Sequence, residues 1–154
     1  MMIQIALESA DQPEIVTLIE ELDAFHDDLY PAESNHLLDI GSLMQPNVIF
    51  CVARADGDPV GCGAAVVYDD YAEIKRMFVS PVCRGRGVGG QMLAYIEAKL
   101  MARNVAVARL ETGIHSTAAI QLYQRSGYRT IPAFGDYWDD PFSLFYEKEL
   151  VDHA

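Results

Sequence analysis

The chain has 154 residues, of which 51% are apolar and 22% charged, with a formal net charge of −12. This length predicts a single domain over residues 1–154 with its own apolar core, and the apolar fraction excludes a disordered chain. The acidic balance argues against nucleic acid and against an anionic membrane surface as partners. No apolar run reaches a membrane span of about 20 residues, and the N-terminus shows no secretory signal, so we expect a cytoplasmic protein.

Metal and disulfide chemistry are not expected. The three cysteines, Cys51, Cys62 and Cys83, are odd in number and widely spaced, which fits neither a disulfide framework nor a zinc site. Buried, reduced thiols are the simpler interpretation.

The charge is unevenly distributed along the chain. Residues 1–74 carry 15 acidic and one basic residue, residues 75–130 carry nine basic and two acidic, and residues 131–154 carry six acidic and one basic. The basic middle segment predicts binding of an anion, because its arginines coincide with a glycine-rich turn. The acidic flanks either handle a cation or are solvated surface.

Apolar periodicity and turn residues predict eleven elements. In chain order we expect a strand over residues 2–8, a helix over about 12–27, a short helix from about 34 to 43, strands over 47–54, 60–68 and 71–80, a helix from the glycine-rich turn to about 103, a strand over 105–111, a helix over 117–126, and strands over 128–131 and 142–149. The order β-α-α-β-β-β-α-β-α-β-β indicates one mixed α/β domain. Within the strand over 71–80, alternation predicts one face made of Glu73, Lys75, Met77 and Val79, and an opposite face made of Ile74, Arg76 and Phe78.

The turn Arg84-Gly85-Arg86-Gly87-Val88-Gly89-Gly90 lies between a predicted strand and a predicted helix. The first turn of a helix offers unpaired N–H groups and partial positive charge, and glycines let the backbone approach a ligand, so an anionic phosphate suits this position. The Gly-Lys-Ser/Thr of nucleotide triphosphatases is missing, and the turn is misplaced for a dinucleotide fingerprint. Taken alone, the turn is equally compatible with a structural role.

Three separated segments of the sequence resemble motifs of one known protein family. Residues 84–89 match the Arg/Gln-x-x-Gly-x-Gly/Ala signature of the GNAT superfamily of acetyl-CoA dependent N-acetyltransferases, the strand EIKRMFVSP precedes them, and AIQLYQRSGY is similar to the family's Ala-x-x-Leu-Tyr segment. The resemblance covers residues 1–150 and implies the GNAT fold, with a mixed, mostly antiparallel central sheet of about seven strands and flanking helices. It also implies an acyltransferase of a bacterial subgroup with small-molecule acceptors.

By this resemblance, acetyl-CoA is the co-substrate and no metal takes part. The implied coenzyme-binding residues are the loop Arg84, Gly85, Arg86, Gly87, Val88, Gly89 and Gly90, the strand residues Met77, Phe78 and Val79, and Ser116. In the family, the loop amides hold the pyrophosphate, and the splayed strand pairs with the pantetheine arm. Ser116 stands where many relatives have Asn, which puts that contact in doubt.

The resemblance also assigns the chemistry. Tyr123 occupies the position of the family's general acid. A phenol suits this role because it is protonated at neutral pH and can donate its proton to a departing thiolate. Its alternative role is a core tyrosine. Glu73 is the candidate base that deprotonates the amine, directly or through water. The alternatives are that water alone is the base and that Glu73 merely pairs with Lys75.

The acceptor is expected to be the primary amine of a small molecule. The candidate acceptor-binding residues are Tyr30, Glu33, His115, Tyr137 and Trp138. All of them except His115 belong to a predicted mouth of aromatic and acidic residues that suits a cation. The alternative is that the acidic loop residues only keep the protein soluble. Two alternatives are acetylation of a protein amine and a non-catalytic acyl-CoA binding module. Many family members dimerise, so a homodimer is an expectation by analogy.

Overall fold

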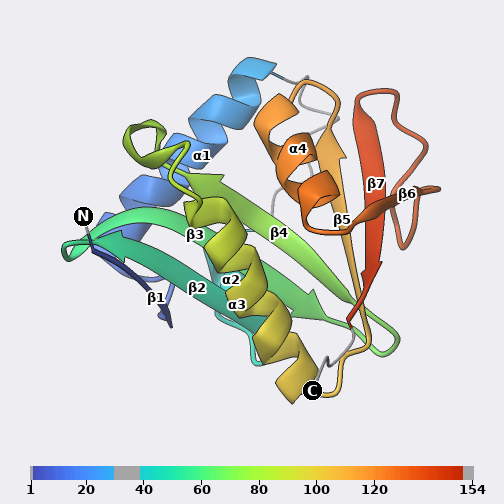
Figure 1. The fold of residues 1–154 in the computed structure, drawn as a ribbon, viewed down its shortest axis with the longest axis horizontal. Helices are drawn as coiled ribbons and strands as arrows, with labels where there is room; N and C mark the ends of the chain where they lie inside the picture. Colours follow the sequence, from blue (N-terminus) through green and yellow to red (C-terminus); the bar gives the residue numbers. More distant parts are fainter. Residues whose placement is uncertain (1, 30–38, 151–154) are drawn as a thin grey trace.

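The computed structural model describes residues 2–29 and 39–150. Its elements are β1 (Ile3–Leu7), α1 (Pro13–Leu29), α2 (Ile40–Leu43), β2 (Val48–Ala55), β3 (Asp58–Val67), β4 (Ala72–Val79), a 3-10 turn (Pro81–Cys83), α3 (Val88–Ala102), β5 (Val107–Gly113), α4 (Thr117–Arg125), β6 (Arg129–Ile131) and β7 (Ser143–Glu149). The predicted order of elements is confirmed (Figure 1). The second helix is described only from residue 40, because residues 30–38 lie outside the described part, and the 3-10 turn was not predicted.

All seven strands form one sheet in the order β1-β2-β3-β4-β5-β7-β6. Every neighbouring pair is antiparallel except β4 and β5, which run parallel, so the expected mixed, mostly antiparallel sheet is confirmed. Helices cover both faces: one apolar cluster joins α3 and Tyr123 of α4 to the sheet, and a second joins α1 and α2 to the opposite face (Figure 1). No described helix is long and apolar enough to cross a membrane.

The parallel pair β4 and β5 is short. Only Ala72–Ile74 pairs with Ala108–Leu110, although both strands continue beyond this contact. The two strands therefore separate toward their C-terminal ends, and no other described strand pairs with the β4 edge that this separation frees. Figure 1 shows α4 lying over this opening and the N-terminal end of α3 lying beside the C-terminal end of β4.

Strand β4 contains a β-bulge in its middle. The register between β3 and β4 shifts between Cys62 and Ala64, and Arg76 takes a left-handed φ of 60°. Two contacts hold this residue: its guanidinium pairs with Asp23 of α1, and its carbonyl accepts a hydrogen bond from the Cys62 thiol at 3.4 Å. A non-glycine residue at positive φ is costly, so these contacts from α1 and from the adjacent strand β3 compensate the strain.

Because of the bulge, the prediction that Glu73, Lys75, Met77 and Val79 share one face of β4 is wrong. Ile74, which alternation places opposite Met77, packs with Met77 and Val79 in the core cluster under α3. Glu73 and Lys75 lie on the other side, where they contact one another and Tyr137. Alternation holds on each side of the bulge, but the extra residue reverses its phase.

The three cysteines are buried and free, as expected. Burial raises the pKa of the Cys51 and Cys62 thiols to about 12. Both thiols are therefore protonated at neutral pH and behave as small apolar side chains.

Gly61 of β3 provides a stability test, because a Cβ there would lie 2.9 Å from the Phe78 carbonyl oxygen and 3.0 Å from Met92 Cε. We expect Gly61→Ala to lower the free energy of unfolding by about 1–3 kcal/mol through overpacking. The matched control is Gly41→Ala in α2, where the nearest atom is an Asp39 carboxylate oxygen at 3.6 Å. Urea unfolding curves that showed equal midpoints for the two variants would contradict this account of the packing.

Candidate active site

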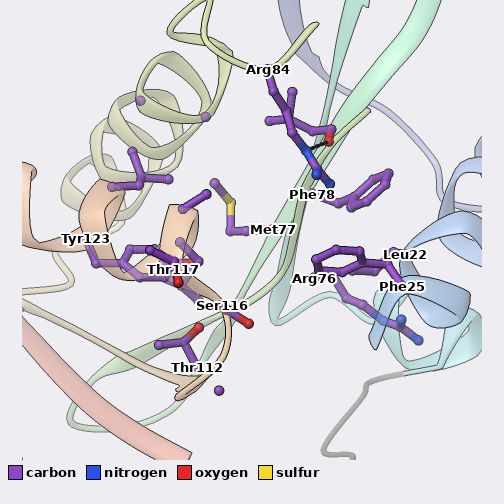
Figure 2. Close-up of a pocket in the computed structure, with 18 of the residues that line it drawn as sticks. Leu22, Phe25, Arg76, Met77, Phe78, Arg84, Thr112, Ser116, Thr117 and Tyr123 are labelled. Carbon is purple, nitrogen blue, oxygen red and sulfur yellow. Dashed lines mark hydrogen bonds between the residues drawn. The ribbon is translucent and has the colours of Figure 1, made fainter. Parts of the chain in front are cut away.

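A cleft of about 700 Å³ opens where β4 and β5 separate. Its walls come from the whole of β4 after Ala72, the turn from Cys83 to Gly90, the end of β5, the first turns of α4, and Leu22 and Phe25 of α1. Figure 2 shows Met77 near the centre, with Tyr123 and Thr117 on one side and Phe78, Arg76, Leu22 and Phe25 on the other. The cleft therefore joins the α4 side of the sheet edge to the α1 side.

The glycine-rich turn forms one end of this cleft. Gly85 and Gly87 have φ values of 79° and 77°, the left-handed region that side chains disfavour, and a Cβ on either would meet no atom within 4 Å. Gly87 is the N-cap of α3, so the first amides of that helix point into the turn without intrahelical partners. The backbone thus offers an open ring of N–H donors at the positive end of a helix, which suits a diphosphate.

The coenzyme-binding residues expected from the sequence lie around the same cleft. The structure places Met77, Phe78, Val79, Arg84, Gly85, Gly87, Val88, Gly89, Gly90 and Ser116 on its lining, whereas Arg86 is exposed beside it. Ser116 is the N-cap residue of α4 and forms no side-chain cap bond. The free β4 edge and the amide turn together suit an elongated molecule with an anionic end, which is the shape of a coenzyme A thioester. Among residues 2–29 and 39–150, no cluster of side chains could hold a metal ion.

Tyr123 lies on α4 and lines the cleft although only 5% of the residue is exposed. Its ring packs against Tyr128 and Tyr146, with centroid distances of 5.8 and 6.5 Å. Burial, assisted by the negative charge of Glu111, raises its pKa well above the ordinary value of 10. The hydroxyl is therefore protonated throughout the neutral range and available as a donor inside the cleft.

Glu73 also lines the cleft and is 5% exposed. It accepts a hydrogen bond from the Tyr137 hydroxyl, and Lys75 Nζ lies 3.4 Å from its carboxylate and 3.0 Å from the Tyr137 oxygen. Burial and the neighbouring Glu73 charge raise the pKa of Tyr137 strongly, so that phenol remains a donor. The carboxylate thus sits in a small polar cluster of Glu73, Lys75 and Tyr137.

This cluster contains the ion pair between Glu73 and Lys75, which the sequence suggested as an alternative role for Glu73. It also contains Tyr137, a partner of Glu73 that sequence reasoning missed. Tyr137 was expected to bind the acceptor, and no short-range pattern links it to a strand 64 residues earlier. The second missed contact is the ion pair between Asp23 and Arg76. Aspartate in an amphipathic helix gives no signal of a distant partner.

The remaining acceptor-binding candidates are dispersed. His115 lines the cleft and its ring lies 6.1 Å from Phe142, whereas Trp138 is 50% exposed and is not among the lining residues. Tyr30 and Glu33 lie outside the described residues. The expected aromatic mouth is partly internal, because Phe134 is buried in a ring cluster with Tyr71, Tyr137 and Phe145.

Comparison with known proteins identifies the family. The chain matches the acetyltransferase (GNAT) family over residues 15–128. It is 47% identical over 150 residues to a protein from Azospirillum brasilense named IAA acetyltransferase, with 96% of this chain and 98% of that protein aligned.

Solved structures agree. A chain from Klebsiella pneumoniae, whose proposed activity is that of an acyl-CoA N-acyltransferase, is 39% identical with a TM-score of 0.83, covering 97% of this chain and 99% of that one. The PaiA N-acetyltransferase from Thermoplasma acidophilum, solved with coenzyme A, shares the fold at 18% identity and a TM-score of 0.73, covering 97% and 99%. This chain therefore belongs to the GNAT family of N-acetyltransferases.

Proposed function

We propose that this chain transfers the acetyl group of acetyl-CoA to a primary amine of a small molecule by direct attack. The observation that carries the proposal is the position of Tyr123, whose protonated phenol lines the same cleft as the amide turn and the free edge of β4. The relative named IAA acetyltransferase supports a small-molecule acceptor. A cleft with one end suited to a diphosphate and a proton donor farther along it has the parts that thioester aminolysis needs.

In the proposed reaction, the amine nitrogen forms a bond to the acetyl carbon while the carbon–sulfur bond breaks. Backbone N–H groups near Met77 and Phe78 stabilise the negative charge that develops on the carbonyl oxygen. Tyr123 gives its proton to the departing sulfur. Glu73, or a water molecule in its place, accepts the proton that the amine loses, and Lys75 and Tyr137 hold the Glu73 carboxylate at the cleft wall.

Replacing Tyr123 by Phe removes the proposed acid without changing the size of the ring. We expect kcat for thiol release from acetyl-CoA to fall by about 10²-fold or more, while the Kd for coenzyme A stays the same. The matched control is Tyr128→Phe, because Tyr128 is an equally buried neighbour that bonds to Glu97 and does not line the cleft. Unchanged kcat in Tyr123→Phe would assign this residue to the core, and coenzyme binding without turnover across an amine panel would favour an acyl-CoA binding module.

The raised pKa of Tyr123 also predicts a pH profile. A general acid is active below its pKa in the folded protein, and burial moves that limit above the ordinary value of 10. We therefore expect kcat at saturating substrates not to fall between neutral pH and pH 10, the unperturbed value for a phenol. Circular dichroism at each pH would confirm that the protein stays folded. A decline in kcat centred below pH 10 would contradict the assignment of Tyr123 as the general acid.

Glu73→Gln tests the base. If Glu73 accepts the amine proton, we expect kcat/KM at neutral pH to fall by about 10-fold or more. Lys75→Met keeps the carboxylate and removes one of its partners, so it serves as a comparison that perturbs the cluster alone. Wild-type kcat/KM in Glu73→Gln would contradict this role and favour water as the base.

A further inference from the structure

Two basic side chains of β4 at the cleft have carboxylate partners, whereas the arginine after the 3-10 turn has none in the described part of the chain. Lys75 pairs with Glu73 at 3.4 Å, and Arg76 pairs with Asp23. Arg84 also lines the cleft, but no described carboxylate lies within ion-pair distance of it. A cation of this kind beside a cleft is a recognition element for an anionic group.

The Arg84 guanidinium is oriented by three contacts. Its Nε donates a hydrogen bond to the carbonyl of Val79 at 3.0 Å, and its central carbon lies 5.2 Å from the centre of the Phe25 ring and 5.7 Å from that of Phe78. Of the guanidinium nitrogens, only Nε has a hydrogen-bond partner among the described residues. Four of its five N–H donors have no partner among residues 2–29 and 39–150, and a planar edge of this kind matches a carboxylate in a fork.

The same contacts show that the Arg84 side chain points away from the amide turn to which its backbone belongs. In Figure 2, Arg84 reaches down toward Phe78, on the side of Met77 where Leu22 and Phe25 lie and away from Tyr123. Leu22, Phe25 and Phe78 line the cleft, and Phe25 is 41% exposed. The α1 side of the cleft thus presents apolar and aromatic side chains together with Arg84, a cation with no described carboxylate partner, and Arg76, which is paired with Asp23.

We propose that this Arg84 subsite, defined by Arg84, Phe25, Phe78 and Leu22, selects an acceptor that carries a carboxylate and an apolar or aromatic body in addition to its amine. Arg84 holds the carboxylate through the free edge of its guanidinium. The body lies on Phe25 and Leu22, and the amine is directed across Met77 toward Tyr123. The proposal rests on the proposed function and specifies its acceptor, which differs from the cation suggested by the acidic loop residues.

The test compares matched acceptors in two arginine variants. The acceptors are L-phenylalanine with L-phenylalaninamide, and 4-(aminomethyl)phenylacetate with its carboxamide, which separate the amine and carboxylate by different lengths. We expect Arg84→Gln to lower kcat/KM for a carboxylate acceptor by about 10-fold or more relative to its own amide, without raising the KM for acetyl-CoA. Arg86→Gln removes the same charge two residues away, from a side chain that does not line the cleft, and should leave that ratio unchanged.

Three outcomes decide the matter. If Arg84→Gln weakens acetyl-CoA binding and leaves the carboxylate-to-amide ratio unchanged, the side chain serves the coenzyme and the proposal is wrong. If the amides are acetylated as well as the carboxylates by wild-type enzyme and by Arg84→Gln, the proposed function stands and the subsite does not. If none of the four is acetylated, calorimetry on the coenzyme A complex decides: carboxylate binding lost in Arg84→Gln supports the subsite, and absent binding overturns it.

Discussion

The site depends on the loss of pairing between two neighbouring strands. Strands β4 and β5 share only three residue pairs before they separate, and every part of the cleft follows from that separation. An unpaired strand edge inside a protein is a liability, because its N–H and C=O groups lack partners. Here the edge is placed beside a helix N-terminus and a ring of open amides, so an extended ligand with a diphosphate end can satisfy both features at once.

The basic side chains at this opening are held mainly by ion pairs with individual carboxylates, and the net charge of the chain does not describe them. The chain carries a formal charge of −12, yet the cleft contains several basic side chains. Two of them on β4 are neutralised by carboxylates, which fixes their positions and those of the carboxylates. Glu73 in particular is held by a lysine and a phenol, so its orientation at the cleft wall is set before any acceptor arrives.

Short-range patterns predicted much of this molecule. The eleven strands and helices follow from apolar periodicity, and the amide turn follows from glycines between a strand and a helix, because both signals lie within a few residues. The bulge at Arg76 gave no signal, since an arginine at positive φ is imposed by tertiary contacts and not by local preference. The hydrogen bond between Tyr137 and Glu73 joins residues far apart in sequence, so no local pattern predicts it. The contact between Arg84 and Phe25, which defines the α1 side of the cleft, is equally long-range and was not predicted.

The buried thiols have a consequence for an enzyme that handles a thioester. A deprotonated cysteine near an activated acetyl group would compete with the amine by thiol exchange. With pKa values raised to about 12, Cys51 and Cys62 are thiolates in only about one molecule in 10⁵ at pH 7. The Cys62 proton is engaged with the Arg76 carbonyl as well. Burial therefore keeps both thiols protonated, and the hydrogen bond that braces the bulge also engages the Cys62 thiol beside β4.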